Sequence, residues 1–250
     1  MNHSLQFPSL GRFTQLSHCL TTRNFPHDVT KPPGQKNFLK FFGNSRSSLV
    51  LPHQTHSSEI QVIMSDHQFP LDKQIVGDGL MTQQKNIWIG ILVADCFPIL
   101  YFDPVQAIIA VVHAGWRGID QDIHLKTLLY MSDTMNSSLN TLRIGIGPGI
   151  GSCCFKVGKE VSEKFRQRTF SSQYVKTLSE HKDTIDLRGI LIAEFQETGI
   201  PIEHIEYMDF CTVCRSDLFY SYRKEGKSTG RFMLAARLNP GSIEKSDRMI

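Results

Sequence analysis

The sequence predicts an α+β fold, with many short strands in mixed order and a few helices. Apolar runs of strand length recur along the chain and are bounded by turn residues, while other segments repeat apolar residues with helical spacing. The chain has 250 residues, 40% of them apolar and 20% charged. This composition is sufficient to bury one large core. Because nothing marks a linker, we expect residues 1–250 to form a single domain.

The stretch Ile91–Gly118 is the part around which we organise the prediction. It contains three apolar runs, which are Ile91–Ala94, Ile99–Phe102 and Ala107–Val112. A turn at Asp103-Pro104 separates the last two runs, so the stretch predicts a buried hairpin or strand pair.

Two reactive side chains lie at the ends of these runs. Cys96 follows the first run, and His113 closes the last one. Strand ends are where functional groups are often presented by a rigid scaffold. We therefore take Cys96 and His113 as candidate site residues.

The remaining elements are predicted from periodicity and turn residues. We expect residues 1–48 to be loop-rich and residues 239–250 to be a frayed tail. Within the first segment a strand is predicted near Phe13–Thr22 and a short helix around Gln35–Phe42. Further strands are predicted at Ser48–Leu51, Glu59–Met64, Leu142–Ile146 and Pro201–Tyr207. Helices are predicted at Ile119–Ser132, Val157–Arg168 and Asp186–Thr198, and a hairpin at Phe219–Ala236.

Two of these helices have informative ends. Asp186 is a suitable N-cap and Gly199 a suitable C-terminal stop. The helix after His113 would direct its backbone N–H groups and Arg117 towards Cys96 and His113, an arrangement that suits an anion such as phosphate. Arg117 is alternatively a structural ion-pair partner.

Polar residues upstream are weaker candidates when each is taken alone. His53 and His56 are three residues apart in a turn or at a strand end, where surface histidines are common and where a pair alone is weak evidence for a metal. Asp78 lies between two glycines, a pattern typical of an aspartate that caps its own turn.

The other cysteines have mainly structural interpretations. Cys153 and Cys154 follow a glycine-rich stretch, and adjacent cysteines rarely form a disulfide without strain, so buried packing is expected. Cys211 and Cys214 have the spacing of half a zinc site or of a redox pair, but no second Cys-x-x-Cys or histidine pair completes them in the sequence.

Charge and composition exclude several classes. The net charge of +3 is mild, and the basic residues are scattered, so no nucleic-acid partner is expected. No apolar segment approaches the roughly 20 residues needed to cross a bilayer, and no secretory signal is visible. Six irregularly spaced cysteines do not resemble a secreted disulfide framework, so we expect a cytoplasmic protein. Dinucleotide and ATP loops are not found in a supporting context.

Cys96 with His56 and His113 would supply one thiolate and two imidazoles, a set that zinc binds tetrahedrally with a fourth position open. A Cys and His pair also supports a thiolate nucleophile with a histidine base. The spacing of these residues does not choose between the two.

The sequence resembles the YfiH/laccase-domain family almost from end to end. The resemblance rests on five motifs in order: Gln54-Thr-His56, Gly77-Asp-Gly-Leu-Met-Thr82, Ala94-Asp-Cys-Phe-Pro98, His113-Ala-Gly-Trp-Arg-Gly118 and Ile146-Gly-Pro-Gly-Ile-Gly-Ser-Cys-Cys-Phe155. Weaker motifs follow at Cys211-Thr212, Phe219-Tyr-Ser-Tyr-Arg223 and Thr229-Gly-Arg231.

The resemblance implies a sandwich of mixed β-sheets flanked by helices, related to the Cys-His toxin deamidases. It implies that His56, Cys96 and His113 bind zinc. It further implies a purine nucleoside phosphorylase that uses phosphate to cleave adenosine, inosine and S-methyl-5'-thioadenosine, and that deaminates adenosine.

Four further residues are candidates within this function. Arg117 would compensate the charge of phosphate, and Asp78 would position or polarise the base or a bound water. His53 and Arg231 are candidate substrate contacts. One departure lies after Thr21-Thr-Arg23, where many relatives have a glycine-rich turn and this chain has Asn24-Phe-Pro-His.

Three other functions use the same residues. The first is a cysteine hydrolase that acts on an amide, for example in peptidoglycan precursor editing, with Cys96 as nucleophile and His113 as base. The second is a copper-dependent polyphenol oxidase, which we disfavour because the sequence lacks the additional paired histidines of multicopper enzymes and copper binding would be adventitious. The third is a binding protein with a structural zinc, which would need a fourth protein ligand.

Overall fold

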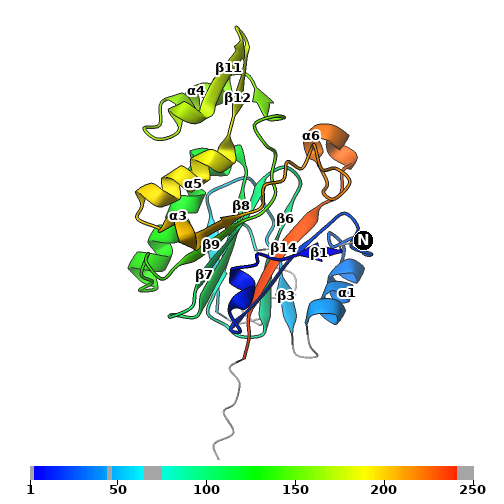
Figure 1. Ribbon diagram of the computed structural model, residues 1–250. Helices are drawn as coiled ribbons and strands as arrows, with labels where there is room; N and C mark the ends of the chain where they lie inside the picture. The colour runs from blue at the N-terminus through cyan, green and yellow to red at the C-terminus, as the bar shows by residue number, and fades with distance from the viewer. Residues whose placement is uncertain (1–2, 44–46, 65–74, 241–250) are drawn as a thin grey trace, which may run out of the picture.

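A computed structural model describes residues 3–43, 47–64 and 75–240 of the chain. Two mixed β-sheets pack face to face, and helices cover their outer faces (Figure 1). The predicted α+β class and the sandwich of mixed sheets are therefore confirmed. No helix among the described residues is long and apolar enough to cross a membrane.

The six-stranded sheet has the order β13-β9-β7-β8-β5-β4. Its strands are β4 (Ile60–Ile63), β5 (Gly79–Thr82), β7 (Phe97–Asp103), β8 (Ile108–Ala114), β9 (Arg143–Ile146) and β13 (Ile205–Tyr207). β4 is parallel to β5 and β13 is parallel to β9, whereas the pairs between β9, β7, β8 and β5 are antiparallel. The predicted hairpin is β7–β8, with its turn after Asp103, whose side chain accepts hydrogen bonds from the amides of Val105 and Gln106.

The five-stranded sheet has the order β1-β2-β14-β6-β3. Its strands are β1 (Ser4–Leu5), β2 (Leu16–Thr21), β3 (Ser48–Val50), β6 (Ile87–Val93) and β14 (Phe232–Leu238). The apolar run that begins at Ile91 thus belongs to a different sheet from the β7–β8 hairpin. β14, near the end of the chain, pairs with β2 and β6, so segments far apart in sequence form the middle of this sheet.

The predicted hairpin at Phe219–Ala236 is wrong. Its first half contains a short helix, α6 (Tyr222–Glu225), because the Ser221 hydroxyl caps the helix by accepting a hydrogen bond from the amide of Lys224. Its second half is β14, which has partners on both edges and needs no hairpin partner of its own.

Alternation along the strands explains the layers. In β14, Phe232, Leu234 and Ala236 face the core between the two sheets, whereas Met233 and Ala235 face a smaller core under α1 (Pro32–Phe42). A strand buried on both faces reads as a continuous apolar run.

The outer face of the six-stranded sheet packs against α2 (Trp116–Asp120), α3 (Ile123–Leu129) and α5 (Leu187–Glu197). The single helix predicted at Ile119–Ser132 is wrong, because Asp122 adopts a left-handed backbone conformation with φ of 62° and separates α2 from α3. The N-cap role of Asp186 is confirmed, since its side chain accepts a hydrogen bond from the amide of Gly189. Gly199 follows α5 with φ of 96°, as its stop role requires.

Two other helices have ends that differ from the sequence prediction. α1 begins at Pro32 and not at Gln35, because proline is well suited to the first turn of a helix. The helix predicted at Val157–Arg168 is α4 (Lys159–Arg166). It packs beside a small sheet of β10 (Lys156–Val157), β11 (Val175–Ser179) and β12 (Lys182–Ile185). None of these three strands was predicted, and β11 and β12 lie at the top in Figure 1.

Asn239 was predicted to belong to the frayed tail, but it is hydrogen-bonded to the rest of the fold. Its amide donates to the carbonyl of Gln15, and its side-chain amide donates to the carbonyl of Thr14. The rest of the predicted tail, residues 241–250, lies outside the described residues.

Candidate metal site

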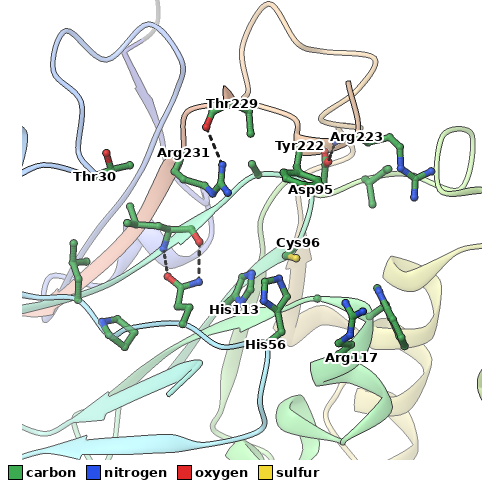
Figure 2. A pocket seen from close by; sticks show the side chains of 18 of the residues that line it. Thr30, His56, Asp95, Cys96, His113, Arg117, Tyr222, Arg223, Thr229 and Arg231 are labelled. Carbon is green, nitrogen blue, oxygen red and sulfur yellow. Dashed lines mark hydrogen bonds between the residues drawn. The ribbon is translucent and has the colours of Figure 1, made fainter. Parts of the chain in front are cut away.

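Three side chains that are distant in sequence meet at one end of the sandwich. His56 lies in the loop between β3 and β4, Cys96 in the turn between β6 and β7, and His113 in β8. Their ligand atoms all lie within 4.8 Å of one another (Figure 2). The two imidazole rings meet edge to face, with 4.8 Å between centroids.

The strand register explains why His113 faces this point. Ile109 and Val111 face the core between the sheets, and His113 continues the same two-residue alternation. On the neighbouring strand Gly79 pairs with Val112, and the amide of His113 donates to the carbonyl of Asp78 at 2.8 Å. Asp78 and His113 are therefore cross-strand neighbours on one face.

The Asp78 carboxylate connects two of the three residues. It is fully buried. One oxygen accepts hydrogen bonds from the amide of His56 at 3.0 Å and from His113 Nδ1 at 2.8 Å. The other accepts from the amides of Thr55 at 3.0 Å and Ser57 at 2.7 Å, and from the Ser57 hydroxyl at 2.8 Å.

This network fixes the protonation of both groups. Burial raises the pKa of Asp78, but the hydrogen bonds from His113 and Ser57 outweigh burial and hold the pKa well below its usual range. An ionised carboxylate can only accept, so Nδ1 of His113 carries a proton and Nε2 is the nitrogen that a metal would bind.

Cys96 and His113 each shift the pKa of the other. Burial alone would raise the pKa of the Cys96 thiol, but His113 and His56 lower it to about 6. Burial would lower the pKa of His113, but Cys96 and Asp78 raise it to about 9. Between these values the metal-free pair is a thiolate beside an imidazolium, and the thiolate is the form that binds metals.

The turn that carries Cys96 is held by Asp95, which the sequence motif contained but to which we assigned no role. Asp95 has φ of 88°. Its carboxylate accepts hydrogen bonds from the Thr212 hydroxyl and the Arg223 amide, both at 2.6 Å, and its carbonyl accepts from the amide of Ile150 at 2.7 Å. Only the position of this aspartate beside the cysteine could have indicated its role.

Gly115 is a second residue that sequence reasoning missed. A Cβ at this position would lie 2.8 Å from Cys96 Sγ and 3.3 Å from His56 Cδ2. The absence of a side chain therefore allows these two ligands to approach each other beside the end of β8.

A pocket of about 1150 Å³ opens over the three residues. Three arginines line it: Arg117, Arg223 and Arg231. Apolar side chains of Leu51, Leu92, Ile150 and Phe155 line other parts of its wall. The combination offers apolar surface for a planar ring and positive charge for an anion.

Of the remaining candidate residues, three line the pocket and one does not. The exposed Arg117 guanidinium lies in the pocket wall, stacked on its neighbour Trp116 at 4.3 Å from the ring centroid. Arg231 also lines the pocket, and its Nη1 donates to the carbonyl of Thr229 (Figure 2) and to that of Gly230. His53 lines the pocket as well. Asp78 instead lies beneath the two histidines, with protein groups on both oxygens.

The three residues fit a metal ion. Two imidazoles and a thiolate are a common zinc donor set, and three protein ligands are the number found at catalytic zinc sites. Within the described ranges no fourth histidine, cysteine or carboxylate joins this group, so a structural site saturated by such ligands is not supported.

The prediction that the adjacent pair Cys153 and Cys154 is buried is wrong. Cys153 is exposed and not buried, and Cys154 is half-buried. The Cys211 and Cys214 pair is not an isolated half-site, because the fold places all four sulfurs within 4.8 Å of one another. The adjacent-cysteine pair completes the set, and its irregular spacing from Cys211 concealed this in the sequence.

A mixed sandwich with a His2Cys cluster at the strand ends defines a class of proteins with a candidate metal centre at the base of a pocket. The chain belongs to the family described as multi-copper polyphenol oxidoreductase laccase, whose sequence profile matches residues 9–239.

Individual relatives carry purine-related names. Adenosine deaminase RL5 from an unknown prokaryotic organism is 34% identical over 198 residues, which cover 76% of this chain and 74% of the relative. Purine nucleoside phosphorylase YlmD from Bacillus subtilis is 26% identical over 227 residues, covering 88% and 81%. The crystal structure of the hypothetical protein YfiH from Bacillus licheniformis matches with a TM-score of 0.83 and 26% identity, covering 91% of this chain and 94% of that one.

Gly115→Ala tests the close approach at the candidate metal site. The new methyl group would overlap Cys96 Sγ, so we expect zinc affinity, measured by competition with a chromogenic chelator, to fall by at least about tenfold. Gly11→Ala is the matched control, because a Cβ there meets nothing within 4 Å. Equal zinc affinity in the two variants would contradict the packing argument.

Proposed function

We propose that the chain is a zinc-dependent purine nucleoside phosphorylase that acts on adenosine, inosine and S-methyl-5'-thioadenosine and also deaminates adenosine. The observation that carries this proposal is the His56, Cys96 and His113 cluster at the base of an arginine-lined pocket. The names of the relatives support the same two activities, with purine nucleosides and phosphate as substrates. Six cysteines without disulfides agree with a reducing, cytoplasmic location.

His56, Cys96 and His113 would hold the metal, and Asp78 would position both histidines. When bound, zinc would act as a Lewis acid and would lower the pKa of a water molecule at its open position to about 7. Because both Asp78 oxygens accept hydrogen bonds from the protein, we assign Asp78 a positioning role and not a contact with the base.

The pocket wall would bind the two substrates. In phosphorolysis a phosphate oxygen forms a bond to the ribose C1' as the bond to the purine nitrogen breaks, so the anion must be held beside the sugar. Arg117 is our candidate for this contact, because its guanidinium can bind a phosphate through two parallel hydrogen bonds. His53 and Arg231 are candidate contacts to the nucleoside.

The properties of Cys96 favour a second candidate function, a cysteine hydrolase that acts on an amide. A thiol with a pKa of about 6 beside an imidazolium is an activated nucleophile in the absence of metal. We rank this second, because the same two residues together with His56 form a three-ligand donor set. The copper oxidase function stays disfavoured, and we propose that any bound copper is adventitious.

Metal removal separates the two candidate functions. Purified protein is incubated with adenosine and phosphate, with and without prior chelation, and adenine, inosine and ribose 1-phosphate are separated by chromatography. We expect chelation to abolish both activities and added zinc to restore them.

A cysteine hydrolase predicts the opposite behaviour. Its activity would survive chelation and would be lost to an alkylating agent. Because the thiolate forms above the Cys96 pKa, the rate of that inactivation would rise with pH through about 6. This outcome would contradict the zinc-dependent function.

Arg117→Gln tests phosphate binding separately from the metal. Deamination needs no phosphate, whereas a lost charge-assisted hydrogen bond is worth about 1.5–3 kcal/mol, or roughly 10- to 100-fold. We therefore expect kcat/KM for phosphate to fall by about that factor while adenosine deamination is little changed. Arg12→Gln, at an exposed arginine that does not line the pocket, is the control. A proportional loss of both activities would contradict the assignment.

A further inference from the structure

Four cysteines form a second cluster, separate from His56, Cys96 and His113. Cys153 and Cys154 lie in the turn after β9, and Cys211 and Cys214 lie between β13 and α6. Cys214 Sγ is 3.7 Å from Cys153 Sγ and 3.6 Å from Cys154 Sγ, and all four sulfurs lie within 4.8 Å of one another. None of the four is in a disulfide.

The sulfur separations match a metal site better than a disulfide. A tetrahedron with zinc–sulfur bonds of about 2.3 Å has sulfur–sulfur edges of about 3.8 Å. The separations of 3.6 and 3.7 Å are close to that edge. A disulfide would require about 2.05 Å.

The four sulfurs lie close enough together for one cation to bind them all. Without a cation, four thiolates at these separations would repel one another.

The turn that carries the adjacent cysteines packs closely against Cys211. The carbonyl of Gly151 accepts hydrogen bonds from the amides of Cys154 and Phe155, both at 2.9 Å. A Cβ at Gly151 would lie 3.1 Å from Cys211 Cβ and 3.3 Å from Cys153 Sγ. The Arg223 guanidinium also donates to the carbonyl of Cys154 at 3.1 Å, which places a positive charge next to the pair.

We propose that Cys153, Cys154, Cys211 and Cys214 bind a second zinc ion with a structural role. Four thiolates in tetrahedral positions are a donor set of zinc, and a saturated site has no open position for chemistry. This inference does not depend on the proposed enzymatic function, because no residue is shared between the two clusters.

The second zinc ion would join two loops that support the pocket. The first loop carries Ile150 and Phe155 into the pocket wall. The second carries Thr212, whose hydroxyl donates to Asp95 beside Cys96. Gly149 and Cys211 already form an isolated bridge between these loops. The metal would therefore hold the wall of the first site in place from behind.

The test uses the full chain, purified under reducing conditions, with the first site removed by Cys96→Ser and His113→Ala together. We expect this variant to retain about one zinc ion per chain, with about four sulfur neighbours at about 2.3 Å by zinc X-ray absorption. Adding Cys214→Ser should remove that zinc, whereas adding Cys19→Ala should not, because Cys19 is buried elsewhere in the five-stranded sheet.

Wild-type protein provides a measurement that does not depend on any variant folding. Two loaded sites give about two zinc ions per chain and an average of about 2.5 sulfur neighbours per zinc, since five cysteines serve two ions. One zinc per chain with about one sulfur neighbour would overturn the proposal. Iron in place of zinc, or a disulfide within the cluster found by mass spectrometry of the reduced preparation, would also overturn it.

Discussion

The buried Asp78 carboxylate is the interaction on which the site depends. Taking a carboxylate out of water costs several kcal/mol unless hydrogen bonds replace its hydration. Asp78 receives hydrogen bonds from Thr55, His56 and Ser57 on one loop and from His113 on β8. The hydrogen bonds that make this burial tolerable therefore also orient two of the three candidate metal ligands.

The rest of the fold supplies the third ligand and the pocket around it. Cys96 lies where the chain leaves one sheet at the end of β6 and enters the other at the start of β7. Asp95 ties this crossing point to segments that carry Ile150, Thr212 and Arg223. The candidate metal site, the pocket wall and the cysteine cluster thus lie next to one another, near the point where the chain passes from one sheet to the other.

Elements formed by neighbouring residues could be predicted from the sequence, because the pattern of residues along a segment indicates the structure of that segment. The β7–β8 hairpin and the α5 cap followed from apolar periodicity and from Asp186. The hairpin prediction at Phe219–Ala236 is wrong because β14 pairs with β2 and β6, which are distant in the sequence, and a local pattern does not indicate such partners. The break at Asp122 was not predicted, because the spacing of apolar residues does not reveal one residue in a left-handed conformation.

The same distinction applies to the site. The motifs singled out His56, Cys96 and His113, but only the fold shows that their ligand atoms converge. Asp78 was interpreted as a turn residue or a substrate contact, because its partners are more than 20 residues away in both directions. The cysteine cluster was missed for the same reason, since about 60 residues separate its two halves.

The most direct test of the central claim is the zinc dissociation constant of the His56, Cys96 and His113 site in Asp78→Asn, measured by chelator competition at neutral pH in chains that also carry Cys214→Ser. Asparagine cannot accept all the hydrogen bonds that the carboxylate accepts, so His113 loses its fixed tautomer and affinity should fall about 10- to 100-fold. Asp103→Asn is the control, because Asp103 is equally buried and accepts backbone hydrogen bonds at the opposite end of β7. Zinc affinity unchanged by Asp78→Asn would contradict the account.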